Sequence, residues 1–153
     1  MWKYKFNKHG YLLKYKARLV IRGDLQPTSN LDTYTATLAG KSFRSIMAVV
    51  AKWDLELLQY DAISAFTNST LDELVYIHYP IGFPRPGWVL RLNKALYGLR
   101  RSPLLWQEEF GTTLRSLGLQ QGTEEPCIYY NNWLLLFYYM DDITVAYRKK
   151  DES

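Results

Sequence analysis

The hydrophobic and polar residues of this chain repeat with two different periods, which predict short strands and two longer helices. Period-two alternation, and short uncharged runs rich in aromatic and β-branched residues, are typical of strands. The segments with these patterns are residues 2–6, 11–21, 55–61, 75–79, 88–92, 127–130, 133–138 and 143–147. We expect 127–130 and 133–138 to pair across a two-residue turn at Asn131-Asn132, because asparagine tolerates positive φ.

The helical period occurs in residues 41–53 and in the segment that starts near Ser102. The apolar residues on the expected buried faces are Phe43, Ile46, Met47 and Val50 in the first helix, and Trp106, Phe110, Leu114 and Leu117 in the second. Ser42 and Ser102 are candidate N-caps, with Pro103 at the first helical position of the second helix. Gly118 is expected to end that helix.

Two adjacent acids, Asp141 and Asp142, interrupt the apolar and aromatic stretch 134–147 and therefore lie at an expected hairpin tip. Carboxylates beside a water-excluding sheet repel each other and are poorly solvated, unless a cation or hydrogen-bond donors offset the cost. Asp61 closes the expected buried strand 55–61 and shares that environment. A solvated turn for the pair and a helix N-cap for Asp61 are the alternative interpretations.

Asp61, Asp141 and Asp142 form a candidate metal site, since carboxylates without His or Cys partners favour hard cations such as Mg²⁺. Two such ions about 3.5–4 Å apart can activate the attacking oxygen of a phosphoryl transfer and stabilise the leaving oxygen. A metal-dependent phosphohydrolase is a weaker alternative, because His9 and His78 are both far in sequence from the acids and no general base is evident.

Composition places the chain among globular proteins that contact a polyanion. A length of 153 residues predicts one domain, and 48% of the residues are hydrophobic. No apolar run reaches the roughly 18–20 residues of a membrane span. Residues 1–24 hold seven basic residues and one acid, and residues 74–107 hold five basic residues and no acid. Such segments suit a polyanion, although a solvated strand face would look the same.

Four stretches resemble, in the same order, the fingers and palm region of copia-type retrotransposon reverse transcriptases. They are residues 16–23 (KARLVIRG), 59–66 (QYDAISAF), 92–106 (LNKALYGLRRSPLLW) and 139–142 (YMDD). The resemblance implies an α+β fold, in which an antiparallel palm sheet packs with helices and a basic fingers β-hairpin stands in front. It also implies a single partial domain over residues 1–153, with 1–37 and 67–101 fingers-like and 38–66 and 102–147 palm-like.

The resemblance further implies an RNA-directed DNA polymerase that uses two Mg²⁺ ions, or Mn²⁺ in their place. A primer 3′-hydroxyl would attack the α-phosphate of a deoxynucleoside triphosphate, and pyrophosphate would leave. The implied partners are an RNA template, a DNA primer and deoxynucleoside triphosphates, with no membrane. The implied location is intracellular, in a cytoplasmic particle or in the nucleus.

The same resemblance assigns roles to residues. The metal ligands and catalytic residues would be Asp61, the backbone carbonyl of Ala62, Asp141 and, more weakly, Asp142. The nucleotide contacts would be Lys16, Arg18, Phe66, Tyr97 and Gly98. The template and primer contacts would be Tyr139, Met140, Arg100, Arg101, Ser102 and Pro103. Phe66 would crowd the sugar 2′ position, with a plain core role as the alternative. Which of Lys16 and Arg18 reaches the triphosphate stays open.

The family pattern continues beyond this sequence with a further palm helix and strand and then a thumb. We therefore expect a fragment of a polyprotein, without thumb, ribonuclease H or integrase segments, that leaves some apolar surface bare. We also expect the chain alone to be a weak or inactive polymerase. The alternative function is a catalytically inactive nucleic-acid-binding remnant that uses only the basic segments.

Overall fold

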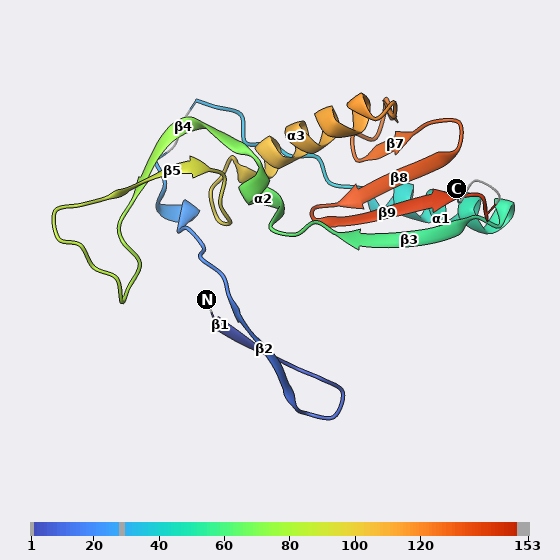
Figure 1. Cartoon of the computed structure of the whole chain (residues 1–153). Coiled ribbons are helices and arrows are strands. Elements are labelled where there is room, and N and C mark those ends of the chain that lie inside the picture. Colours follow the sequence, from blue (N-terminus) through green and yellow to red (C-terminus); the bar gives the residue numbers. More distant parts are fainter. Residues whose placement is uncertain (1, 28–29, 150–153) are drawn as a thin grey trace.

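The computed structural model describes residues 2–27 and 30–149, which form a mixed α/β fold with antiparallel sheets (Figure 1). The strands are β1 (Trp2–Phe6), β2 (Leu12–Ala17), β3 (Glu56–Asp61), β4 (Thr70–Ile77), β5 (Leu90–Lys94), β6 (Gln120–Gln121), β7 (Ile128–Tyr130), β8 (Leu134–Tyr139) and β9 (Asp142–Tyr147). The helices are α1 (Gly40–Trp53), α2 (Ala65–Asn68) and α3 (Ser102–Ser116), with a 3₁₀ turn at Gly23–Leu25. No helix in the described part is long and apolar enough to cross a bilayer.

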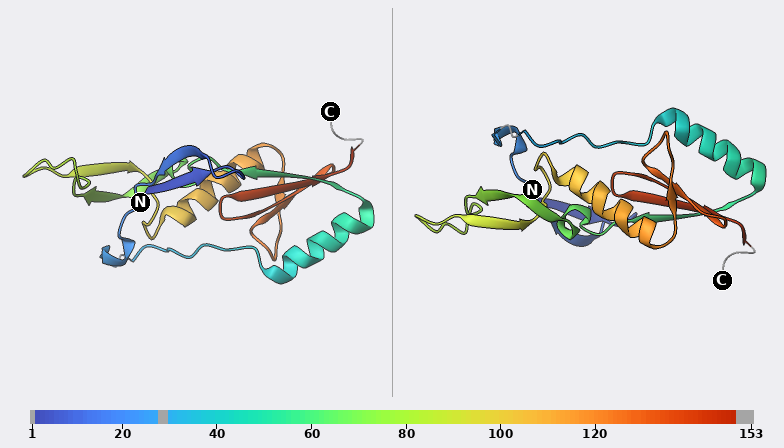
Figure 2. Two further views of the ribbon diagram at one scale, coloured as in Figure 1. Left: turned by 90° about the horizontal axis from the view of Figure 1, so that it is seen from below. Right: turned by 90° about the horizontal axis from the view of Figure 1, so that it is seen from above.

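The largest sheet has the strand order β3-β9-β8-β7-β6, with α1 on one side of it (Figure 2). The main core lies between this sheet, α1 and the end of α3, and its buried residues include Ile46, Val50, Leu114, Tyr129, Leu136, Phe137 and Ala146. A second core joins α2 to the start of α3 through Ala65, Phe66, Ala95, Leu105 and Trp106. The predicted apolar helix faces are confirmed at Ile46, Val50, Trp106 and Leu114, but Phe43 and Leu117 are 45% and 66% exposed.

The β1–β2 hairpin projects from the body of the molecule and has two different faces (Figure 1). Cross-strand pairing sets Lys3 opposite Lys16 and Lys5 opposite Lys14. Because side chains alternate along a strand, the aromatic residues lie on the other face. Tyr4 pairs with Tyr15 there, with ring centroids 5.4 Å apart. The predicted basic hairpin is therefore confirmed, and its lysines share one face.

Three predicted strands differ from the observed strands by two residues or more at an end. The strand expected over 11–21 ends at Ala17, because the backbone N–H of Ile21 donates to the carbonyl of Tyr97 (2.8 Å). The strand expected over 75–79 is β4, which begins at Thr70 because Thr70 pairs with Lys94. The strand expected over 88–92 is β5. It begins and ends two residues later than predicted, because Lys94 pairs with Thr70.

Both predicted serine N-caps are wrong. The N-cap positions of α1 and α3 are Ala39 and Arg101, and neither side chain caps its helix. The hydroxyl of Ser42 donates instead to the carboxylate of Glu125. The hydroxyl of Ser102 bonds to the backbone of Leu96, which is a tertiary partner that the local sequence does not reveal.

Two further expectations about the main sheet need correction. The strand ending at Asp61 is not buried, because β3 lies at the edge of the sheet and all six of its residues are exposed. The turn between β7 and β8 is longer than two residues, since the last pair before it is Tyr130 with Leu135. The side chain of Asn131 closes this loop by accepting the backbone N–H of Trp133 at 3.0 Å.

Candidate active site

The two apolar runs around the acids pair as β8 and β9, and their turn carries the acidic residues. Tyr139 and Asp142 form the last cross-strand pair, so Met140 and Asp141 are the turn itself. Met140 has a φ of +56°, a backbone angle that residues other than glycine rarely adopt. The predicted hairpin tip is thus present, with Asp141 in the turn and Asp142 as the first residue of β9.

The edge strand β3 brings Asp61 to this turn, although about 80 residues separate them in the chain. In the β3–β9 register Asp61 lies directly opposite Asp142. The backbone N–H of Ala62 donates to the carbonyl oxygen of Asp141 at 3.0 Å, which extends the ladder by one step. The structure therefore gathers the three predicted acids at one end of the sheet.

A hollow of about 330 Å³ opens beside the acids, between them and the base of the β1–β2 hairpin. Its lining includes Asp61, Ala62 and Asp141 from the sheet, and Lys14, Lys16, Arg18 and Tyr97 from the facing segments. Asp142 is not among the lining residues. The hollow thus has an acidic wall and a basic wall, which is an arrangement suited to a metal-bound phosphate compound.

Electrostatic effects confirm that these walls face each other. Burial raises the pKa of the Tyr97 hydroxyl, and the negative charge of Asp141 raises that pKa further, while Arg18 acts in the opposite direction. The pKa of the Lys16 ammonium is lowered, first by Arg18 and then by Lys5, and Asp61 opposes this change. The Lys16 ammonium and the Tyr97 hydroxyl therefore both lie within the field of an acid of the site.

Aromatic packing places Tyr97 between the hollow and the second core. The guanidinium of Arg18 lies over the Tyr97 ring, 5.6 Å from its centroid. On the core side, the rings of Phe66 and Tyr97 have centroids 4.7 Å apart. Phe66 is only 8% exposed and does not line the hollow, so its contact with Tyr97 favours the core role as far as this structure describes it.

Two glycines hold the segment after the hairpin against the Tyr97–Gly98 loop. Gly98 has a φ of +92°, and a Cβ there would lie 2.0 Å from the carbonyl oxygen of Ile21. A Cβ on Gly23 would lie 1.9 Å from the carbonyl oxygen of Gly98. Both positions require glycine for a close backbone approach. The family resemblance assigns Gly98 to nucleotide contact, and no sequence rule indicates Gly23 as its packing partner.

The residues predicted to contact the template are engaged mainly within the protein. The guanidinium of Arg101, 7% exposed, is paired with the carboxylate of Asp72, and Ser102 is fully buried. The Arg100 side chain donates to the carbonyl of Gly23 at 2.9 Å. These contacts favour structural roles for the three residues. Tyr139 and Met140, at 53% and 46% exposed, remain accessible to a ligand, and half-buried Pro103 lines a small cavity beside Met140.

The donor set fits a hard divalent cation in type, because carboxylate and carbonyl oxygens are the ligands that Mg²⁺ prefers. Asp61, Ala62 and Asp141 line the same hollow. Within residues 2–27 and 30–149, however, no three His, Cys, Asp or Glu side chains are grouped closely enough to hold a metal ion. The carboxylates of Asp61 and Asp141 therefore belong to residues that line the hollow, and Asp142 lies opposite Asp61 in the β3–β9 register.

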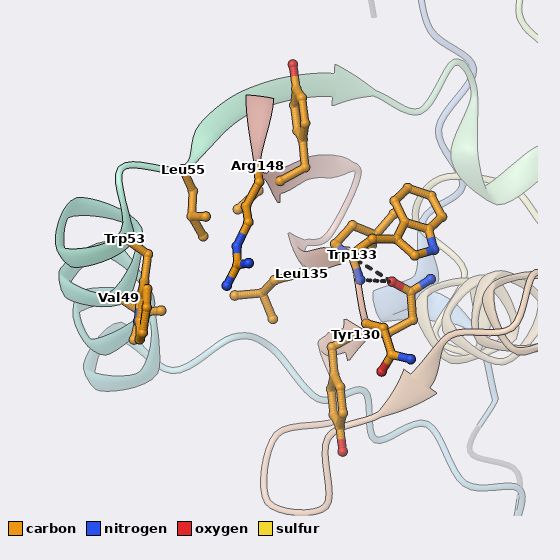
Figure 3. A pocket seen from close by; sticks show the side chains of 12 residues that line it. Val49, Trp53, Leu55, Tyr130, Trp133, Leu135 and Arg148 are labelled. Atoms are coloured by element: carbon orange, nitrogen blue, oxygen red, sulfur yellow. Dashed lines mark hydrogen bonds between the residues drawn. The ribbon is translucent and has the colours of Figure 1, made fainter. Parts of the chain in front are cut away.

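A second hollow, of about 210 Å³, lies at the opposite end of the main sheet (Figure 3). The end of α1 and the β7–β8 loop line it, with Trp53, Tyr130, Trp133 and Arg148 among the side chains. The guanidinium of Arg148 lies 5.9 Å from the centroid of a Trp53 ring. This hollow is separated from the acids by the full length of β9 and takes no part in the candidate active site.

Comparison with known proteins agrees with this combination of antiparallel sheet, acidic turn and basic hairpin. The family model described as reverse transcriptase (RNA-dependent DNA polymerase) matches residues 1–152, and the chain belongs to that family. It is 33% identical over 97% of its length to the retrovirus-related Pol polyprotein from transposon TNT 1-94 of Nicotiana tabacum. It is also 32% identical over 93% of its length to the Pol polyprotein from transposon RE2 of Arabidopsis thaliana.

These relatives confirm the predicted resemblance to copia-type elements. The chain spans 12% of the length of the tobacco polyprotein and 10% of the Arabidopsis one. No solved structure matches the chain significantly.

Proposed function

We propose that this chain supplies the catalytic acids and the nucleotide-binding surface of an RNA-directed DNA polymerase. The observation that carries the proposal is the β3–β9 register, which sets Asp61 opposite Asp142 and next to the Asp141 turn. Lys16 and Arg18 face these acids across one hollow. Within this proposal, residues 1–37 and 67–101 are fingers-like, and residues 38–66 and 102–147 are palm-like.

In the proposed reaction a primer 3′-hydroxyl attacks the α-phosphate of a deoxynucleoside triphosphate opposite an RNA template. Asp61, Asp141 and the carbonyl of Ala62 would hold divalent metal, with Asp142 in support, and Mg²⁺ there would supply countercharge to the reacting phosphate. Lys16 and Arg18 attract and orient the triphosphate. Base choice comes from pairing with the template, so the chain contributes position and charge.

Metal binding by the acids tests this proposal directly. We expect Mn²⁺ to bind wild-type protein, as measured by electron paramagnetic resonance, and to bind at least tenfold more weakly to Asp61→Asn and Asp141→Asn. Asp54→Asn is the matched control, because Asp54 lies at the other end of the β3 segment and Asn also tolerates its φ of 49°. Equal Mn²⁺ affinity in all four proteins would overturn the proposal.

Binding of an RNA–DNA primer–template separates the proposal from its alternative. A working site predicts that Mg²⁺ strengthens binding of the primer–template together with a deoxynucleoside triphosphate, and that Asp141→Asn abolishes this effect while Asp54→Asn retains it. A nucleic-acid-binding remnant predicts salt-sensitive affinity that Asp61→Asn leaves unchanged or improves, together with no metal binding. That second result would replace the polymerase proposal with the remnant.

A further inference from the structure

We propose that Trp106 is a positioning residue for the acidic turn. Its indole N–H donates to the carbonyl oxygen of Met140, the residue that immediately precedes Asp141, at 3.4 Å. Trp106 belongs to α3 and not to the sheet that carries the acids. Its functional meaning rests on the proposed polymerase site, but the hydrogen bond can be tested independently of any activity.

The indole is fixed firmly enough to act as a support. Trp106 is 8% exposed and stacks on Phe110, with ring centroids 5.1 Å apart and planes 8° from parallel. Phe110 in turn packs edge-on against Tyr138 of β8, at 5.2 Å. The helix that carries the indole is thus tied to the strand that leads into the turn.

The turn needs such support because its own conformation is unfavourable. Met140 has a φ of +56°, and non-glycine residues keep such angles only where surrounding contacts enforce them. Two successive carbonyls of the turn are held from different elements. The N–H of Ala62 binds the carbonyl of Asp141 from the β3 side, and Trp106 binds that of Met140 from the α3 side.

Packing leaves a gap behind the acidic turn. A small apolar cavity of about 60 Å³ lies behind the turn and is lined by Phe66, Pro103, Trp106, Tyr138 and Met140, among others. Side chains there do not fill the space against Met140, so the indole N–H provides a directional contact. Loss of that contact should free the turn without unfolding the sheet.

Amide hydrogen exchange followed by NMR tests the positioning role. We expect Trp106→Phe to speed exchange of the Ala62 N–H about three- to tenfold, relative to the N–H of Gly122, which bonds to Ile128 far from the turn. Phe43→Leu is the matched control, since Phe43 packs edge-on against Phe137 of the same strand β8, with ring centroids 6.1 Å apart, and leaves the indole and its stack in place. Similar exchange ratios in the two variants would overturn the proposal.

Mn²⁺ affinity is the second measurement, because a purely structural role would not change it selectively. Trp106→Phe should weaken Mn²⁺ binding about tenfold, the low end for groups that orient metal ligands, while Phe43→Leu leaves it within twofold. Faster exchange of the Ala62 N–H in Trp106→Phe, together with no Mn²⁺ binding in wild-type protein, would support the positioning role and overturn the polymerase proposal. Normal Mn²⁺ affinity in Trp106→Phe would overturn the positioning role alone.

Discussion

Two buried serines show how differently one hydroxyl can affect this fold. Ser102 is 0% exposed, and its hydroxyl donates to the carbonyl of Leu96 at 2.7 Å and accepts the N–H of the same residue at 3.0 Å. Ser69 is 1% exposed, and its hydroxyl has no hydrogen-bond partner in the described structure. The first hydroxyl therefore stabilises the loop before α3, whereas the second only bears a desolvation cost.

Replacement by alanine should consequently affect the free energy of unfolding differently at Ser102 and at Ser69. We expect Ser102→Ala to lower the free energy of unfolding by about 2 kcal/mol, because it leaves the part-buried N–H of Leu96 without its acceptor and removes one of the two donors to the Leu96 carbonyl. Ser69→Ala should leave it unchanged or raise it by about 1 kcal/mol. Urea denaturation followed by circular dichroism measures both. Equal destabilisation would show that Ser69 has a partner in solution.

At the scale of elements, an ion pair connects β4 to the start of α3. The guanidinium of Arg101 beside Asp72 lowers the pKa of that carboxyl, mainly through their hydrogen bonds. A lowered pKa in the folded state means that the pair stabilises the fold above the unfolded pKa, about 3.9, and ceases to do so as the pH falls through the folded value.

Asp72→Asn should therefore be less stable than wild type near neutral pH. The difference in free energy of unfolding should shrink as the pH drops below about 4, because the wild-type carboxylate then takes up its proton. Asp24→Asn is a suitable comparison: Asp24 also pairs with an arginine, Arg22, but on the exposed surface, where such a pair adds little. A difference between wild type and Asp72→Asn that is constant from pH 3 to pH 7 would contradict the pairing.

The close approach of residues 21–23, which follow the β1–β2 hairpin, to the Tyr97–Gly98 loop should make Gly98 more sensitive to substitution than Gly82, a glycine of similar conformation. Gly98→Ala should lower the free energy of unfolding by about 3 kcal/mol or more, since its Cβ would overlap the carbonyl of Ile21. Gly82 has a similar φ of +94° but open space around it, so Gly82→Ala should show only about 1 kcal/mol of backbone strain. Thermal and urea unfolding measure both, and equal losses would contradict the close contact.

The sequence predicts those elements whose signals are local. The β8–β9 hairpin follows from two uncharged runs around a polar pair, and α1 follows from its periodic apolar face. The serine caps failed because Ser42 and Ser102 found tertiary partners that no local pattern encodes. The approach of Gly23 to Gly98 had a visible signal, two glycines beside apolar runs, but no sequence rule pairs them.

The candidate site likewise has one part that the sequence predicts and one part that it does not. The position of acids at strand ends selected Asp61, Asp141 and Asp142, the family resemblance assigned their roles, and the structure gathers them at one end of the sheet. The bond from Trp106 to Met140 was not predictable, because it joins side chain to backbone across 34 residues in a turn of unusual φ.

As a whole molecule the protein exposes far more surface than its mass requires. Its accessible area is 11335 Å², whereas a compact monomer of 18.0 kDa would expose about 8,000 Å². Part of the excess comes from projecting hairpins, including the loop after β4, where Ile81, Phe83 and Trp88 are all at least 70% exposed. The β1–β2 hairpin adds a face with four lysines opposed in like-charged pairs, which is unfavourable unless an anion offsets it.

This lysine face should govern the salt dependence of nucleic-acid binding. Replacing Lys5 and Lys14 by Gln should weaken binding to a single strand and reduce the slope of log affinity against log salt by about 0.7 per lysine that contacts phosphate. The matched control replaces Lys41 and Lys52 of α1 by Gln, on an element that lies on the far side of the main sheet from the hollow beside the acids (Figure 2). This control has the same net charge as the hairpin variant and should keep the wild-type slope. Equal slopes in both double variants would show that the hairpin does not bind phosphate.

The exposed position of β3 has a consequence for the purified protein. Its outer backbone N–H and carbonyl groups have no neighbouring strand in the described structure, and Leu57, Leu58, Gln59 and Tyr60 carry no charge between the acids at its ends. Natural proteins usually protect such strands with lysine, proline or a bulge. Concentrated solutions should therefore grow intermolecular ribbons from this strand, and a Leu58→Lys exchange should suppress them and keep the protein dispersed.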